Sequence, residues 1–200
     1  MIRRANSETG QAAPLYITAM TGLLFLALVF FAFGEADVQR NGAQTAADAS
    51  ALAAAKDSRS KMALELKAHI TDRGYYIAVF NLPFFGSRNT CPQASAWASK
   101  NDATNAHCIW PYQGRWAFFV DLQSEKGMST KLVPRTKGKK AKTEAVAVVE
   151  NLCKFIPNPD MTSSSIGEVV CKSGLVWVVS PHNVAVMPKM ADLFSVRLEA

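Results

Sequence analysis

The chain has 200 residues, of which 49% are hydrophobic and 19% are charged, and its formal net charge is +6. One membrane span and one helical segment leave about 130 residues, enough for one small domain with its own core. Much of the positive charge lies in a run of four lysines that no stacking aromatic residues flank. We therefore expect a solvated loop and no nucleic-acid partner, with attraction to an anionic envelope or polymer as the alternative. The run comprises Lys137, Lys139, Lys140 and Lys142.

The chain carries no charged residue from Gln11 to Gly34. This length matches the roughly 20 apolar residues that cross a hydrocarbon core of about 30 Å. Two arginines precede the run and two acidic residues follow it closely. The positive-inside tendency therefore predicts a single-pass protein of the cell membrane, with a cytoplasmic N-terminus and an extracellular C-terminal domain.

A cleaved secretory signal is the main alternative to this anchor. Ala32-Phe33-Gly34 has the small-x-small pattern of a cleavage site. The apolar run is longer than the roughly 7–15 residues of the hydrophobic region of a signal peptide, which favours a retained anchor. The alternative protein would be a secreted or surface binding module released after Gly34, which recognises a polymer or surface through aromatic residues and the lysine run.

An alanine-rich segment follows the apolar run. We expect one helix from near Pro14 to near His69, ended by Asp72-Arg73-Gly74, because helix-forming residues dominate and no proline interrupts its second half. Gly34 and Gly42 are its weak points, each costing up to about 1 kcal/mol relative to alanine, and the helix is free to bend at one of them.

Small residues recur at i, i+4 on one face of this segment. Such rows let another helix approach closely. The neighbour is either another protein or the chain's own globular domain, and the alternative is that alanine merely favours helix. The predicted helix-packing interface comprises Ala43, Ala46, Ala47, Ser50, Ala51, Ala54 and Ala55.

The remainder of the chain has the pattern of a small β-rich domain. Lys172-Ser173-Gly174 predicts a hairpin turn, and residues 89–105 predict a loop or a short helix. The six predicted strands are Gly74–Asn81, Arg115–Leu122, Thr143–Val149, Glu168–Cys171, Leu175–Val179 and Phe194–Leu198.

Four cysteines, Cys91, Cys108, Cys153 and Cys171, all follow the span. None has the C-x-x-C spacing of zinc or redox sites, and an exterior location favours disulfides. Of the three pairings we favour Cys91–Cys108 with Cys153–Cys171, because each closes a short loop, worth about 3 kcal/mol in the chain-entropy model.

No residue pattern indicates catalysis. The three histidines and the aspartates are scattered, and no phosphate loop, dinucleotide fingerprint, zinc-protease or calcium-loop motif is present. We expect no enzyme activity, no cofactor and no metal site. The four tryptophans favour a core role over a binding platform, because a small sheet needs large apolar residues.

Two stretches carry a family resemblance. Residues 10–16, Gly-Gln-Ala-Ala-Pro-Leu-Tyr, precede the span, and residues 40–53, Arg-Asn-Gly-Ala-Gln-Thr-Ala-Ala-Asp-Ala-Ser-Ala-Leu-Ala, follow it. Together with the span they resemble TadE/TadG-like proteins of the Flp (tight-adherence) pilus system, most closely the actinobacterial, TadG-related kind. The resemblance implies a single-pass, pilin-like structural or assembly component. Its partners would be the lipid bilayer and other pilus-assembly or pilin-like proteins, including further copies of itself.

One departure from the pilin pattern concerns processing at Gly10. Processed pilins typically have glutamate at the fifth residue after the cleaved glycine, and Leu15 occupies that position here. We therefore expect an uncleaved anchor.

The expected fold is α+β, with a long N-terminal transmembrane and stalk helix followed by a small disulfide-stapled antiparallel β domain. The expected domains are residues 1–10 as a cytoplasmic N-terminus, 11–34 as a transmembrane helix, 35–72 as an alanine-rich stalk and 73–200 as an extracellular β-rich domain.

Overall fold

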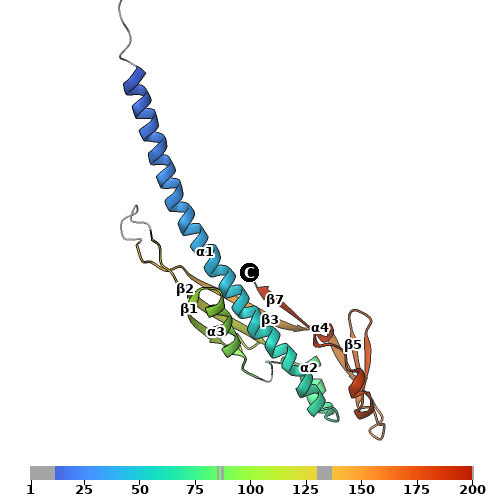
Figure 1. The fold of residues 1–200 in the computed structure, drawn as a ribbon. Helices are drawn as coiled ribbons and strands as arrows, with labels where there is room; N and C mark the ends of the chain where they lie inside the picture. Colours follow the sequence, from blue (N-terminus) through green and yellow to red (C-terminus); the bar gives the residue numbers. More distant parts are fainter. Residues whose placement is uncertain (1–11, 85, 87, 130–136, 200) are drawn as a thin grey trace, which may run out of the picture.

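The computed structural model describes residues 12–84, 86, 88–129 and 137–199. Its longest element is the helix α1, Ala12–Ala68, which is about 85 Å long at 1.5 Å per residue. The helix continues through Gly34 and Gly42 without interruption. Its N-terminal half stands clear of the molecule, whereas its C-terminal half lies along the rest of the chain (Figure 1).

A short helix, α2 (Arg73–Asn81), follows α1. The predicted strand over Gly74–Asn81 is therefore wrong. Asp72 caps the helix by accepting a hydrogen bond from the backbone N–H of Tyr75 at 3.0 Å, so the predicted end of one helix is the start of the next. The buried side chains recur at helical spacing, namely Tyr76, Val79 and Phe80. Capping and this burial outweigh the β preference of the tyrosines and valine.

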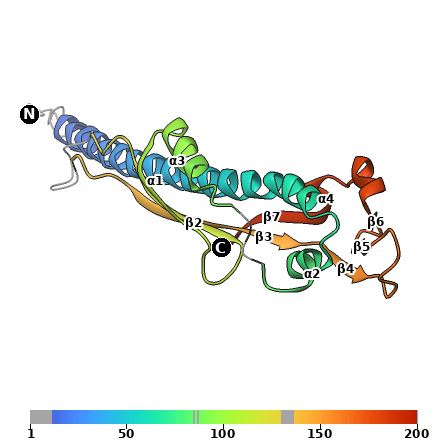
Figure 2. The same cartoon turned by 90° about the horizontal axis from the view of Figure 1, so that it is seen from below.

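A four-stranded antiparallel sheet packs against the C-terminal half of α1. The helix α3 (Cys91–Lys100) packs on both α1 and the first strand, so the sheet and α3 together cover one face of the second half of α1. Figure 2 shows α1 and α3 lying over the same face of this sheet. The strands, in their order across the sheet, are β1 (Ala103–Ile109), β2 (Ala117–Ser124), β3 (Lys142–Asn151) and β7 (Phe194–Glu199).

A second, three-stranded antiparallel sheet lies at the end of the molecule farthest from the N-terminal half of α1 (Figure 2). Its turn at Lys172-Ser173-Gly174 is confirmed, and Gly174 supplies the positive φ of 86° that the turn requires. A 3₁₀ helix and a short helix, η1 (Pro181–Val186) and α4 (Met190–Leu193), lead back to β7. The strands are β4 (Cys153–Pro157), β5 (Gly167–Cys171) and β6 (Val176–Val179).

The α+β class is confirmed, and five of the six predicted strands are present as β2, β3, β5, β6 and β7. Two further strands, β1 and β4, were not predicted. The residues of β1 have weak β preference, and its pairing with β2 is irregular between Thr104 and His107. Pairing with a neighbouring strand, rather than local preference, makes these two segments extended.

One hydrophobic core joins the C-terminal half of α1 to the sheets. Met62 and Leu66 of α1 are fully buried together with Tyr76 of α2, Phe118 of β2 and Phe194 of β7. Within the segment expected as an alanine-rich stalk, buried side chains between Ala43 and Leu66 therefore contribute to the core of the domain.

Candidate functional site on the long helix

The N-terminal half of α1 exposes apolar side chains in every direction. None of its described residues from 13 to 34 is buried or charged. Within the described residues, one helix is long and apolar enough to cross a membrane, and its apolar part is this half. A helix that is apolar all round is stable only inside a protein or in a bilayer. The largest exposed side chains include Leu15, Tyr16, Ile17, Leu23, Leu24, Phe25, Leu26, Phe30, Phe31 and Phe33.

The two threonines of this half already have hydrogen-bond partners. The Thr18 hydroxyl donates to the Pro14 carbonyl at 2.7 Å, and the Thr21 hydroxyl donates to the Ile17 carbonyl at 2.8 Å. Each hydroxyl is thus satisfied within its own helix, as an environment without water requires. The segment meets the hydrogen-bonding condition for a lipid environment.

The small-residue face of α1 lies against the chain's own domain. Its members contact the sheet and α3, and all are buried. Because no side chain on this face extends beyond a methyl or hydroxymethyl group, the sheet and α3 approach the helix backbone closely. The exposed fractions are 3% for Ala43 and 0% for Ala46, Ala47, Ser50, Ala51, Ala54 and Ala55.

Polar groups on this face are paired as well as buried. The Ser50 hydroxyl donates to the Ala46 carbonyl at 2.6 Å. The Thr90 hydroxyl donates to the Ala54 carbonyl at 2.7 Å, and the Trp116 indole N–H donates to the Ser58 hydroxyl at 2.8 Å. These bonds fix the position of the sheet and of the α3 N-terminus on the helix.

Sequence reasoning missed the role of Ser58, although a signal for it exists. The row that contains Ser50 and Ala54 continues at i+4 spacing through Ser58 to Met62 and Leu66, and all of these are at most 1% exposed. Extending the row by three helical turns would have joined the small residues to the large core residues. It would also have indicated that the face belongs to a globular core.

Of the two neighbours considered for this face, the structure contains the chain's own domain. The residues of this face are at most 3% exposed, so another protein would have to displace the sheet or α3 to contact them. Packing of these residues against a partner stays a prediction. A bulky side chain substituted on this face would have to enter a filled core, so it should destabilise the domain.

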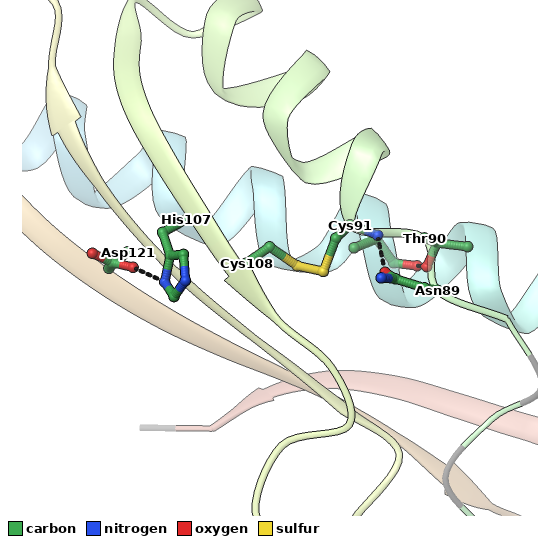
Figure 3. Close-up of a disulfide and its surroundings, with 7 residues drawn as sticks. Asn89, Thr90, Cys91, His107, Cys108 and Asp121 are labelled. Carbon is green, nitrogen blue, oxygen red and sulfur yellow. Dashed lines mark hydrogen bonds and ion pairs between the residues drawn. A yellow bond between two sulfur atoms is a disulfide. The ribbon is translucent and has the colours of Figure 1, made fainter.

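The two disulfides are Cys91–Cys108 and Cys153–Cys171. The first ties the start of α3 to β1, with 5.6 Å between its Cα atoms (Figure 3). Beside it the Asn89 carboxamide accepts a hydrogen bond from the Cys91 backbone N–H at 2.9 Å. The second joins residues directly opposite each other on β4 and β5. Each bond therefore secures one of the two sheets at its margin.

Ionisable groups with shifted pKa values include Tyr75 and Tyr76 of α2 and Glu199 of β7. Burial raises the pKa of Tyr76, whose hydroxyl donates to the Leu66 carbonyl at 3.0 Å. Burial, followed by the charges of Glu65 and Asp72, raises the pKa of Tyr75 to about 12. On β7, the hydrogen bond from Arg115 lowers the pKa of the Glu199 carboxyl. None of these groups faces a substrate-sized cleft with a partner nucleophile.

The described residues do not bring metal-ligating side chains together. No group of three or more His, Cys, Asp or Glu capable of holding a metal ion occurs among them. His107 pairs with Asp121 at 3.0 Å on the outer edge of the sheet, and His69 stacks on Tyr75 with 4.1 Å between ring centroids. All four cysteines are in disulfides.

The aromatic residues divide between core and surface. Trp116 and Trp177 are each 3% exposed and fill the core, whereas Trp97 is 42% exposed beneath the Lys100 ammonium group. Trp110 is partly buried, packs against the core and stacks on Phe118 with 6.2 Å between the ring centroids. The core role therefore holds for three of the four tryptophans.

Comparison with known proteins finds a similarity in the N-terminal part of the chain. Residues 10–57 match the family model described as "Putative Flp pilus-assembly TadE/G-like". No curated protein and no solved structure matches the chain. The matched residues include the exposed apolar half of α1 and the whole of its small-residue face. The match covers 48 of the 200 residues and supports a likeness to TadE/TadG-like proteins over this part of the chain, which also contains the stretch long and apolar enough to cross a membrane.

Proposed function

We propose that the protein is a membrane-anchored, pilin-like structural or assembly component of a Flp (Tad) type pilus or a related envelope assembly, of the actinobacterial TadG-related kind. Residues 1–10 lie in the cytoplasm, residues 11–34 cross the membrane, and the domain that begins within α1 lies outside the cell. The protein acts by helix packing and protein–protein association and carries out no chemical reaction.

The observation that carries this proposal is the exposed apolar half of α1 within the matched region. Residues 10–57 match a pilus-assembly family, and residues 13–34 of the same helix present large apolar side chains that the chain itself leaves uncovered. Only lipid or the apolar helices of other proteins can cover such a surface favourably.

Partner contacts in this proposal use the membrane segment. The small-residue face of α1 is filled by the chain's own domain, so it is not free for a partner. Thr18 and Gly22 are one turn apart on the membrane segment, and a Cβ added at Gly22 would meet no atom within 4 Å. Small residues at this spacing let a second membrane helix pack closely.

The test uses photoreactive side chains at two leucines on opposite faces of the span. Leu26 lies one turn beyond Gly22 on the same face and is 63% exposed, whereas Leu24 faces away and is 66% exposed. We expect crosslinks from Leu26 in native membranes to a pilus-assembly protein or to a second copy of this chain, and crosslinks from Leu24 mainly to lipid. Crosslinks to lipid alone at both positions would contradict association through the span.

Intact mass of the membrane-extracted, non-reduced protein tests the anchor separately. A mass of the full chain less four protons supports a retained anchor with both disulfides. Loss of residues 1–10 indicates a processed pilin despite Leu15. A chain that starts at Glu35 indicates the released binding module and refutes the anchored component.

A further inference from the structure

The connection between β2 and β3 extends beyond the sheet along α1, toward the apolar half of that helix (Figures 1 and 2). Its described arms, residues 125–129 and 137–141, are held together by backbone hydrogen bonds. The Met128 N–H donates to the Lys139 carbonyl at 3.0 Å, and the Gly138 N–H donates to the Met128 carbonyl at 2.9 Å. A Cβ at Gly127 would lie 2.4 Å from the Gly138 carbonyl oxygen. The backbones of the two arms therefore approach each other more closely than a residue with a side chain would allow at this position.

One arm is attached to α1 where its uncharged stretch ends. The Glu35 carboxylate accepts hydrogen bonds from the backbone N–H and the hydroxyl of Ser129, both at 2.7 Å. Glu35 is the first charged residue after the apolar run. These two bonds therefore place the arms at the membrane end of the folded domain.

Four lysines lie on these arms next to the attachment point. Lys126 precedes Met128 on one arm, and Lys137, Lys139 and Lys140 surround Gly138 on the other. All four are exposed. Within the described ranges, none of these four ammonium groups takes part in an ion pair. We call these four residues the lysine cluster.

The length of the apolar stretch sets the level of the lysine cluster. The 23 residues from Ala12 to Gly34 span about 35 Å, and the hydrocarbon core of a bilayer is about 30 Å thick. When this stretch crosses the bilayer, Glu35 emerges in the headgroup layer. Ser129 and the paired Met128 and Gly138 are then at the same level, which puts the lysine cluster among the headgroups.

We propose that the lysine cluster binds the anionic phospholipid headgroups of the bilayer that α1 crosses. The inference rests on the membrane placement proposed above. Charge complementarity and position both favour lipid as the occupant, because the cluster has no stacking aromatic residues for a nucleic acid and lies beside the span. Headgroup binding by the arms, together with the Glu35 attachment, gives the domain a second point of contact with the bilayer and limits its rotation about α1.

The test places the full chain in nanodiscs of phosphatidylcholine, with and without about one-third phosphatidylglycerol. An amine-reactive reagent then measures the modification rate of each lysine by mass spectrometry. We expect the anionic lipid to slow modification of the cluster lysines by about fivefold at low salt, and high salt to remove the effect. Lys154 and Lys172 are exposed on the sheet at the far end of the molecule and should react equally in both lipids.

A variant of the lysine cluster is compared with a control variant of two exposed lysines at the far end of the molecule. Replacing Lys137, Lys139 and Lys140 by glutamine should abolish the lipid-dependent protection of Lys126, whereas Lys154→Gln with Lys172→Gln should preserve it. All these side chains are exposed, so both variants should keep the two disulfides and the unfolding temperature of the parent protein.

Four outcomes overturn the inference. The first is that the cluster lysines are modified at the same rate in both lipids, and the second is that anionic lipid slows modification of Lys154 and Lys172 equally. The third is that inorganic phosphate protects the cluster from modification in phosphatidylcholine discs. The fourth is that anionic lipid still protects Lys126 in the triple variant. Retention of the chain in the discs is scored separately. If the chain is not retained, the proposed anchor fails as well, whereas retention without protection refutes headgroup binding alone.

Discussion

The two halves of α1 form one continuous helix, yet their side chains meet different surroundings. From residue 13 to 34 the largest side chains are exposed on all sides. From residue 43 to 66 the buried side chains form one face, start as alanine and serine and end as Met62 and Leu66. The size of the side chains along α1 depends on what each part of the helix packs against. Small residues lie where the sheet and α3 approach the helix backbone, whereas the large side chains either fill the core, as Met62 and Leu66 do, or are left uncovered by the chain in the apolar half.

This comparison also shows why hydrophobicity alone does not separate the two halves. Both are rich in apolar residues, but charged residues occur only in the second, where one face remains in water. A bilayer surrounds a helix on every side, whereas a sheet covers one face. The distribution of charge around the helix therefore distinguishes the two environments better than the total apolar content does.

The largest expected effect comes from placing an arginine in each half at equally exposed leucines. Leu24 is 66% exposed and Leu64 is 65% exposed. Leu24→Arg should weaken membrane insertion by about 3 kcal/mol, because a charge at the centre of the span must leave water. Leu64→Arg should leave insertion and stability unchanged within about 0.5 kcal/mol, because that side chain already faces water. Carbonate extraction of membranes and the thermal unfolding of the domain measure the two effects.

If Leu24→Arg and Leu64→Arg had the same effect on membrane insertion, the two halves of α1 would not lie in different environments. In particular, full membrane retention of Leu24→Arg would mean that residues 13–34 do not cross the bilayer.

The second prediction exchanges alanine for leucine in both halves. Ala51 is fully buried against the domain, so Ala51→Leu should destabilise it by about 1–3 kcal/mol through overpacking. Ala19 is exposed on the apolar half, so Ala19→Leu should leave the domain unaffected. Thermal unfolding followed by near-ultraviolet circular dichroism measures the difference. A folded, unshifted Ala51→Leu protein would show that the helix face is not packed in the core.

The third prediction concerns pH at the C-terminal end of α1. Burial raises the folded-state pKa of Tyr76 and raises that of Tyr75 to about 12. A tyrosine in the unfolded chain has a pKa of about 10. Above pH 10 the unfolded chain loses protons that the folded chain retains, so stability is full below pH 10 and falls as pH rises toward 12. Unfolding temperatures between pH 8 and pH 12 measure the slope.

The control for this slope is a pair of phenylalanine substitutions. Tyr76→Phe should reduce the loss above pH 10 while costing about 1 kcal/mol at neutral pH, because the Leu66 carbonyl loses its donor. Tyr16 is 66% exposed on the apolar half, so Tyr16→Phe should change neither quantity. An unchanged slope in Tyr76→Phe would assign the alkaline sensitivity to other groups.

Local patterns predicted those parts of the fold that depend on local physics. The long helix follows from its residue preferences, and the hairpin at Lys172-Ser173-Gly174 follows from its turn residues. The strand expected at Gly74–Asn81 failed because Asp72 and three core side chains select a helix there, and burial in a distant core is not a local property.

The candidate site was predictable to a similar degree. The i, i+4 rows identified which residues of α1 pack closely but not what they pack against, because a small side chain permits any close neighbour. The contact between Glu35 and Ser129 joins residues 94 positions apart, and neither residue carries a motif. Only the arrangement of β2 and β3 brings the lysine cluster to the end of the span.

The smallest expected effect concerns the boundary between the two halves, at Gly42. The structure carries α1 through this residue, directly before the first buried alanine, and an added Cβ would meet no atom within 4 Å. Gly42→Ala should therefore stabilise the domain by about 0.5–1 kcal/mol, by restricting the unfolded chain and favouring helix. Gly22→Ala is equally free of clashes but lies in the apolar half, so it should not change domain stability. A destabilising Gly42→Ala would show that the helix must bend there, and the apolar half would then be hinged on the domain rather than continuous with it.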